Sequence, residues 1–283
     1  AEKILLYLAE GFLERKEYDK LYQLYVAEYR YVGALENGRF LYLVGQALEA
    51  LSLLDQASAV YFRAQGLPLS DEDKADLYSR RAEVYLLQKN LAAADRLLRY
   101  VLGIYKDSEY IGEFYYLTGK FYETQGKKNE ALGWYAKATT AAPVPAKINV
   151  YVDARLRMLA VLGQYSEGVE VLSRSRQNKW LGPESLQSWY REFGDGLAGQ
   201  DAQAAIGVYL AGVDGDMPKD SKAAQRIHLQ LGELYRKAGE MEKSRGHFQK
   251  AQAGPDELLK KKAKTTLNQI EIDQGRKSRK TAR

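Results

Sequence analysis

The stretch that decides the fold covers residues 112–145 and reads GEFYYLTGKFYETQGKKNEALGWYAKATTAAPVP. Its spacing predicts two helices packed as a hairpin. Gly119 is small enough for the two helices to approach closely, and the ring of Tyr135 fills the space beside that contact. Gly126 falls in the turn, where a left-handed backbone conformation costs glycine nothing. Pro143 ends the second helix, because proline cannot continue one.

The offsets within this stretch resemble those of a tetratricopeptide repeat, whose pattern reads W-x2-L-G-x2-Y, then A-x3-F, then P. Tyr115 stands where that family has tryptophan, and Thr118 where it has leucine. The other marks of the pattern are filled by Gly119, Tyr122, Ala131, Tyr135 and Pro143. The resemblance implies an all-helical fold and the work of a protein-binding scaffold.

Copies of the same frame follow one another with steps of 36 to 39 residues. The copies begin at Glu2, Gly38, Ala75, Gly112, Asn149, Leu186 and Gln225. All six prolines fall between positions 31 and 35 of a copy. The copy from Leu186 fits least well, since Phe193 stands where a small residue is expected and Gly196 where an aromatic one is. One hairpin cannot bury its apolar face alone, so the copies are expected to stack.

We therefore predict an all-α, right-handed superhelical solenoid of seven hairpins over residues 1–255, with no domain boundary inside it. An apolar stripe after Pro255 predicts a C-terminal cap helix over residues 256–274. Residues 275–283 are basic and have no core-forming side chains, so we expect them to be disordered. This tail holds five of the 42 Lys and Arg residues and no acid, which leaves the body electrically balanced.

The absence of cysteine excludes disulfides and cysteine-based metal or redox sites. No apolar run approaches the ~20 residues of a membrane helix. The opening AEKILLYLAEGF is not a signal peptide, since its apolar run is short and ends in Glu10. Because the chain starts without Met, we interpret it as a processed chain or a fragment. The cysteine-free composition favours a periplasmic or cell-envelope location over a cytoplasmic one.

Catalysis has no support in the sequence. His228 occupies the tryptophan position of its copy, which favours packing over acid–base work, and His247 has no partner at ligand spacing. No phosphate-binding loop, nucleophile elbow or metal-ligand spacing occurs. We therefore predict a non-enzyme without catalytic residues, metal, cofactor or small-molecule substrate.

In proteins that this chain resembles, ligands contact the concave groove lined by the first helix of each hairpin, here frame positions 2, 5, 9 and 12. Tyrosine recurs at position 5 in every second copy, with mixed charges at position 9. The candidate groove residues are Tyr42, Gln46, Glu83, Tyr116, Lys120, Asp153, Arg157 and Tyr190. One interpretation is that Tyr42, Tyr116 and Tyr190 expose their hydroxyl edges to a bound peptide or helix. The other is that they pack against neighbouring first helices.

The predicted function is a scaffold that binds one or more proteins in its groove, in a bacterial cell-envelope or motility assembly. The alternative is a helical-repeat regulator that contacts nucleic acid or an anionic membrane surface through the basic tail. A neutral body argues against nucleic acid, because a protein that tracks RNA is expected to carry a positive stripe. A solvated terminus is the simpler interpretation of the tail.

Overall fold

The computed structural model describes residues 2–31, 37–141 and 147–281, and this part of the chain consists of α-helices and turns without a strand. The chain divides into two compact units, Ala1–Lys147 and Ile148–Arg283. Unit 1 contains α1 (Glu2–Glu14), α2 (Tyr18–Tyr31), α3 (Gly38–Ala50), α4 (Leu54–Gln65), α5 (Asp71–Leu87), α6 (Leu91–Ile104), α7 (Ile111–Thr124) and α8 (Lys128–Thr140). Unit 2 contains α9 (Ile148–Val161), α10 (Tyr165–Gln177), α11 (Pro183–Leu197), α12 (Ala202–Ala211), α13 (Lys222–Lys237), α14 (Met241–Ala253) and α15 (Glu257–Thr281).

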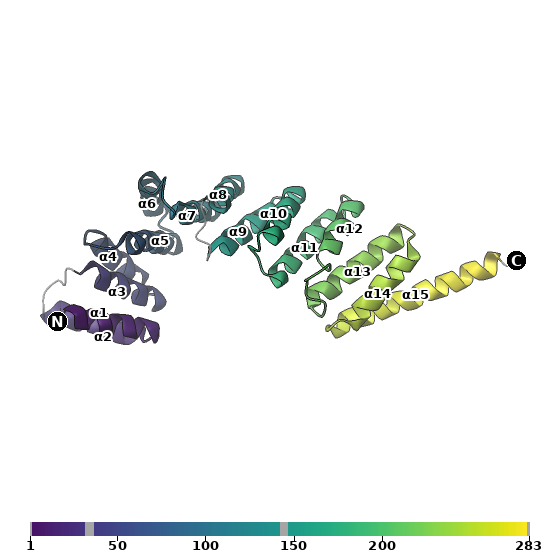
Figure 1. The fold of residues 1–283 in the computed structure, drawn as a ribbon, viewed down its shortest axis with the longest axis horizontal. Coiled ribbons are helices and arrows are strands. Elements are labelled where there is room, and N and C mark those ends of the chain that lie inside the picture. The colour runs from purple at the N-terminus through teal and green to yellow at the C-terminus, as the bar shows by residue number, and fades with distance from the viewer. Residues whose placement is uncertain (1, 32–36, 142–146, 282–283) are drawn as a thin grey trace. The chain divides into compact units, whose positions relative to one another are not determined.

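Within each unit the helices follow one another as pairs joined by short turns (Figure 1). Each odd-numbered helix from α1 to α13 is the first of its pair, and it begins within four residues of a predicted copy of the frame. The all-α class predicted from the sequence is confirmed.

The turn inside a pair repeats one backbone geometry. Gly126 has φ 73°, in the left-handed region that the sequence predicts for it, and connects α7 to α8. Non-glycine residues take the same conformation elsewhere, for example Ser52 at φ 60° between α3 and α4, and Lys89 at φ 56° between α5 and α6. The turn geometry is therefore set by the pairing of the helices, and glycine is only the residue that adopts it most readily.

A small residue on the first helix and a large ring on the second make the contact inside a pair. A Cβ at Gly119 would lie 2.4 Å from Cε1 of Tyr135, and a Cβ at Gly45 would lie 2.2 Å from Cε1 of Tyr61. Tyr135 and Tyr61 are both fully buried. The predicted close approach at Gly119 is confirmed, because no larger side chain fits there.

The copy that begins at Leu186 owes its poor fit to a register change. Gly194, one residue after the expected small position, receives the ring of Tyr209 and would hold a Cβ 2.4 Å from it. Phe193 instead packs against α10, where a Cβ at Gly168 would lie 2.0 Å from its ring. Large rings thus meet glycines on the neighbouring helix: Phe193 meets Gly168, and Tyr165 of α10 meets Gly196, where a Cβ would lie 2.3 Å from the ring. The sequence frame marked Phe193 and Gly196 as mismatches because it does not show these partners.

The last helix, α15, covers the end of unit 2. Ala263, Leu267 and Ile270 form a buried cluster with Leu229 of α13 and Phe248 of α14, as expected of a cap helix. The helix continues to Thr281, whereas the sequence predicted disorder from Gly275; residues 282–283 lie outside the described part of the chain. Lys and Arg have high helix propensity, and positive charge near a helix C-terminus is favourable, so one glycine does not end the helix.

Candidate protein-binding groove

The first helices α3, α5 and α7 of unit 1 carry an ordered set of polar side chains on one face. The N-terminus of α5 is fixed by Ser70, whose Oγ accepts a hydrogen bond of 3.1 Å from the backbone N–H of Asp73. This cap sets where Asp73, Asp76 and Arg80 fall, one turn apart along the helix. We call the surface between α3, α5 and α7 the first-helix groove.

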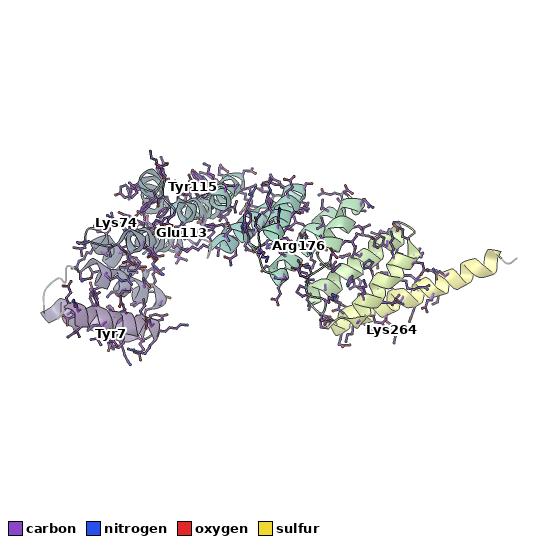
Figure 2. All side chains as sticks on the ribbon, viewed as in Figure 1. Tyr7, Lys74, Glu113, Tyr115, Arg176 and Lys264 are labelled. Atoms are coloured by element: carbon purple, nitrogen blue, oxygen red, sulfur yellow. The ribbon has the colours of Figure 1, made fainter. Side chains whose placement is uncertain are left out.

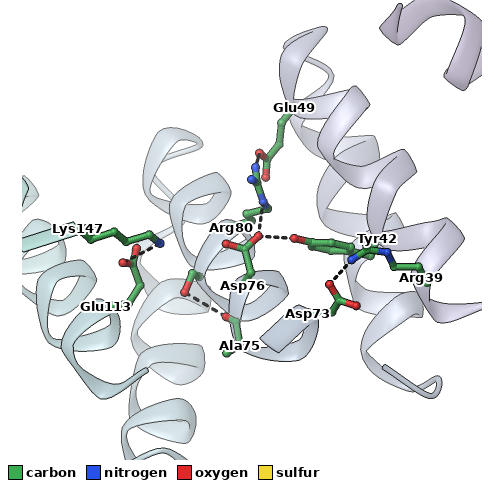
Figure 3. Close-up of polar contacts among 10 residues, drawn as sticks. Arg39, Tyr42, Glu49, Asp73, Ala75, Asp76, Arg80, Glu113 and Lys147 are labelled. Carbon is green, nitrogen blue, oxygen red and sulfur yellow. Dashed lines mark hydrogen bonds and ion pairs between the residues drawn. The ribbon is translucent and has the colours of Figure 1, made fainter. Parts of the chain in front are cut away.

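A hydrogen-bonded network joins α3 to α5 at the centre of this groove (Figure 3). The hydroxyl of Tyr42 donates to Oδ2 of Asp76 at 2.5 Å. Arg80 donates from Nε to the same carboxylate at 2.6 Å and from its terminal nitrogen to Glu49 at 3.0 Å. One guanidinium therefore neutralises two carboxylates from two different helices.

The network fixes the protonation of its members. Burial, with the hydrogen bond and charge of Asp76, raises the pKa of Tyr42, so its phenol remains a donor. Burial also opposes the charge of Asp76, but the Arg80 cation and the hydrogen bonds from Tyr42 and Arg80 outweigh it and lower the pKa of Asp76. Burial raises the pKa of Glu49, with Arg80 acting in the opposite direction.

A cavity of about 400 Å³ opens beside this network, and we call it the Asp76 cavity. Arg39 and Asp73 form an ion pair on one side of it. Lys147 and Glu113 of α7 form another at 3.0 Å on the other side (Figure 3). Exposed Glu72 also lines the cavity. The lining is thus mostly charged.

A second cavity of about 440 Å³, the Glu83 cavity, shares Gln46 and Arg80 with the first, and Glu49 lines it as well. Its remaining walls are largely apolar and come from Leu13, Tyr18, Ala50, Leu54, Val84 and Leu87, together with the carboxylate of Glu83. The two cavities adjoin. The Asp76 cavity, lined mostly by charged side chains, is the charged half of the first-helix groove, and the Glu83 cavity, lined mostly by apolar ones, is its apolar half.

Five of the eight predicted groove residues lie in unit 1, and the structure brings them together. Tyr42 and Gln46 line the Asp76 cavity, and Glu83 lines the other. Lys120 forms an ion pair of 2.8 Å with Glu83, and its Nζ lies 5.6 Å from the ring centre of half-buried Tyr116. Burial works against the charge of Lys120, but the hydrogen bond that Lys120 donates to Glu83, with the charge of Glu83, raises its pKa.

The other three predicted residues belong to unit 2. Asp153 and Arg157 are exposed on α9, and Asp153 accepts a hydrogen bond of 3.0 Å from the indole of Trp189. Tyr190 of α11 is 3% exposed, and burial raises its pKa against the effect of Arg176. Arg176 (Figure 2) reaches from α10 to the backbone oxygen of Ala211 at 3.3 Å.

The expectation that three tyrosines present free hydroxyl edges is wrong at two positions. Tyr42 is 6% exposed and Tyr190 is 3% exposed, and the Tyr42 hydroxyl is engaged by Asp76. These two rings pack between neighbouring helices, as the second interpretation of the sequence held. Tyr42 and Tyr190 are therefore held mainly within the helix packing, although Tyr42 also lines the Asp76 cavity, whereas Tyr116 is half-buried.

Sequence reasoning did not name the residues that dominate the Asp76 cavity. Arg39, Asp76 and Glu113 occupy frame position 2 of three consecutive copies, so the signal was present in the frame. Arg80 lies four residues after Asp76, the spacing of a helical ion pair. What the frame could not show is that Arg80 also reaches Glu49 on the preceding first helix.

No group of three or more His, Asp or Glu side chains among the described residues could hold a metal ion. His228 and His247 face each other in unit 2 with 3.1 Å between their Nδ1 atoms, and His247 stacks on the ring of Tyr235. Burial lowers the pKa of both histidines to about 4, with Lys250 adding to the effect. The pair is a packed contact at the position where the family has tryptophan. No helix in the described ranges has the length and apolar character needed to cross a membrane.

Comparisons with known proteins agree with the fold of paired helices described above. Residues 112–145 match the family model described as tetratricopeptide repeat. Among curated proteins, no significant sequence match was found. The C-terminal part of a TPR repeat-containing protein from Cytophaga hutchinsonii superposes with a TM-score of 0.66 at 9% identity, covering 90% of this chain and 97% of that one.

Two further solved structures have the same fold. A tetratricopeptide repeat protein from Parabacteroides merdae has a TM-score of 0.51 at 14% identity, with 95% of this chain and 98% of that one covered. The apo form of RapI has a TM-score of 0.56 at 14% identity, with 88% and 95% covered. At these identities the likeness concerns the fold.

Paired helices, small-to-large contacts within each pair and a cap helix define a helical-repeat protein. Residues 112–145 are a tetratricopeptide repeat, and the chain has the fold of solved tetratricopeptide-repeat proteins.

Proposed function

We propose that this protein is a non-enzymatic scaffold that binds a segment of a partner protein in the first-helix groove of unit 1. The observation that carries the proposal is the pair of adjoining cavities, of about 400 and 440 Å³, lined by successive first helices. Tetratricopeptide-repeat proteins are in general interaction scaffolds, which supports the same class of function. A role in a bacterial cell-envelope or motility assembly stays part of the proposal.

The charge of the groove indicates the chemistry of the partner. Arg39 is shared by Asp73 and, at 3.5 Å, by Glu10, just as Arg80 is shared by two carboxylates. Lys120 and Lys147 each pair with one carboxylate, and Glu72 adds a further one. Acidic side chains therefore exceed basic ones along the groove, and a basic segment is attracted.

The apolar half of the groove adds a second requirement. Leu54, Val84 and Leu87 line the Glu83 cavity, so the bound segment needs an apolar side chain next to its basic ones. An amphipathic helix or an extended peptide with alternating basic and apolar residues meets both conditions.

The test begins with a photo-reactive amino acid placed at Gln46, which both cavities share, and in a control protein at exposed Ala92 of α6. The segment crosslinked only from position 46 is then synthesised and titrated into the full-length protein. We expect Glu72→Lys to weaken binding of this segment at least fivefold by charge repulsion. The control Glu130→Lys, at an exposed position of α8, is expected to leave binding unchanged. Equal crosslinking from both positions, or equal effects of both substitutions, would contradict the proposal.

The alternative function uses the basic C-terminus, and α15 supplies an observation in its favour. Lys261, Lys262 and Lys264 are exposed on a helix that continues through the basic tail. Binding to phosphates weakens steeply with salt, whereas binding of an amphipathic segment in the groove weakens less. A steep salt dependence that disappears when residues 275–283 are removed would favour this second function.

A further inference from the structure

Arg81 is a buried arginine that forms no ion pair with any residue in the described ranges. It follows Arg80 directly on α5, and the two side chains leave the helix about 100° apart. Arg80 points into the first-helix groove and meets two carboxylates. Arg81 is 8% exposed, and among the described residues its polar partners are neutral.

These neutral partners hold the guanidinium in one orientation. Arg81 donates to the hydroxyl of Tyr85 at 3.1 and 2.8 Å and to the side-chain oxygen of Gln65. Its central carbon lies 4.8 Å from the ring centre of Phe62 and 5.3 Å from that of Tyr85. Buried charges in folded proteins are nearly always paired with an opposite charge, so this site lacks a component that most such sites contain.

The side chain of Arg81 lines an open pocket between α4, α5 and α6, whose positions are labelled in Figure 1. The pocket has a volume of about 280 Å³, below the ~300–1,000 Å³ of sites for whole small molecules. Arg96 is the second charged group in its lining, which includes no carboxylate from the part of the chain that the structure describes. A cavity of this size and charge accommodates one anionic group rather than an extended segment.

The aromatic walls specify what carries that group. Phe62 and Tyr100 both line the pocket and are 62% and 50% exposed, so its lining includes two accessible rings. They offer an apolar contact beside the cation. A guanidinium binds a carboxylate or phosphate through two parallel hydrogen bonds, and neighbouring rings hold the apolar part of the ligand.

We propose that this pocket is a second binding site, separate from the first-helix groove, which takes the oxyanion of an acidic side chain of a partner protein. Arg81 and Arg96 bind the oxyanion, and Phe62 and Tyr100 contact the apolar residue next to it. A glutamate or aspartate carboxylate is the expected source. A phosphorylated side chain has the same chemistry, and the experiment separates the two. This site does not depend on what binds in the groove.

The experiment titrates the full-length protein with three short peptides, acetyl-Ala-Leu-X-Leu-Ala-amide, in which X is glutamate, glutamine or phosphoserine. Binding is followed by fluorescence anisotropy of a labelled peptide and by the NMR signal of the Arg81 Nε–H group. We expect saturable binding of the glutamate peptide, at least tenfold tighter than the glutamine peptide, with a shift of the Arg81 signal. Tighter binding of the phosphoserine peptide would support the oxyanion site with phosphate as the source.

Three variants complete the test. Arg81→Gln is expected to weaken binding of the glutamate peptide at least tenfold. Arg96→Gln changes an exposed residue and leaves the fold intact, and it is expected to weaken binding at least threefold. Arg99→Gln is the matched control, since Arg99 lies on the same helix but pairs with Asp95 at 3.0 Å. Equal binding of the glutamate and glutamine peptides, or binding unchanged in both Arg81→Gln and Arg96→Gln, would overturn the proposal.

Discussion

At the scale of single residues, glycine has two different roles in these helices, and the structure separates them. Gly119 of α7 faces a ring, and a Cβ there would lie 2.4 Å from Tyr135. Gly133 of α8 faces no atom within 4 Å. The first glycine is required by packing, and the second is a helix position where alanine is preferred.

We therefore expect Gly119→Ala and Gly133→Ala to shift stability in opposite directions. Both gain the higher helix propensity of alanine, about 1 kcal/mol. Only Gly119→Ala forces a methyl group into a filled space, which costs about 1–3 kcal/mol more. Urea unfolding of the two variants gives this difference directly. Equal stability of the two would mean that α7 and α8 pack less closely than described.

The two histidines predict a pH dependence of unit 2. Their pKa values are lowered to about 4 by burial, against 6.5 in the unfolded chain. A lowered pKa means that the unfolded chain takes up protons first as the pH falls. Stability from this pair is therefore fully present above pH 6.5 and is lost between pH 6.5 and about 4.

The measurement compares the wild type with the double variant His228→Gln, His247→Gln by hydrogen exchange of α13 and α14 amides. In the wild type, protection is expected to fall between pH 6.5 and 4, after correction for intrinsic exchange. The double variant should lose most of that slope, while carboxylates elsewhere contribute equally to both proteins. The same slope in both would show that the pair does not titrate as described.

At the scale of helices, the sequence predicted where the helices begin better than which side chains contact one another. The repeat frame located the start of each first helix within four residues, because small, aromatic and proline residues recur at fixed offsets. It did not show which residue on the neighbouring helix each mismatch meets: Phe193 packs against Gly168, and Gly196 receives the ring of Tyr165. The frame compares each position only with the same position of the other copies, so it records such a residue as a mismatch and misses its partner.

The same limit applies to the groove and to the second site. Position 2 of the frame holds Arg39, Asp76 and Glu113, but only side-chain geometry shows that Arg80 connects α3 and α5. Arg80 and Arg81 are adjacent residues of the same type, so the sequence alone does not distinguish their roles. The structure distinguishes them, because one meets two carboxylates and the other meets none among the described residues.

The last helix allows a prediction about the tail. The described apolar contacts of α15 end at Ile270, and the sequence of residues 275–283 contains no large apolar side chain that could hold unit 2 together. Deleting them is expected to change the free energy of unfolding by less than about 0.5 kcal/mol, as surface changes usually do. Far-UV circular dichroism should show a small loss of helix. A loss of stability above about 1 kcal/mol would mean that the tail packs on the unit.

At the scale of the whole chain, the sequence predicted one continuous solenoid over residues 1–255, whereas the structure divides into two compact units at Lys147 and Ile148. The step of the frame is 37 residues on both sides of this point, so the repeat spacing contains no sign of the division. Spacing records the length of each hairpin and is insensitive to how tightly consecutive hairpins associate. The repeat spacing therefore could not predict the division into two units.

We expect residues 1–147 and 148–283, produced as separate chains, each to fold cooperatively. A buried core extends from Ala9 to Phe121 within unit 1, and unit 2 has its own buried residues from Ile148 to Ile270. Units of this size bury enough surface to fold alone, and repeat stability is a sum of local terms. Each fragment should show a helical spectrum and a single thermal transition. A fragment without a transition would make its unit dependent on the other, and both fragments failing would contradict the division itself.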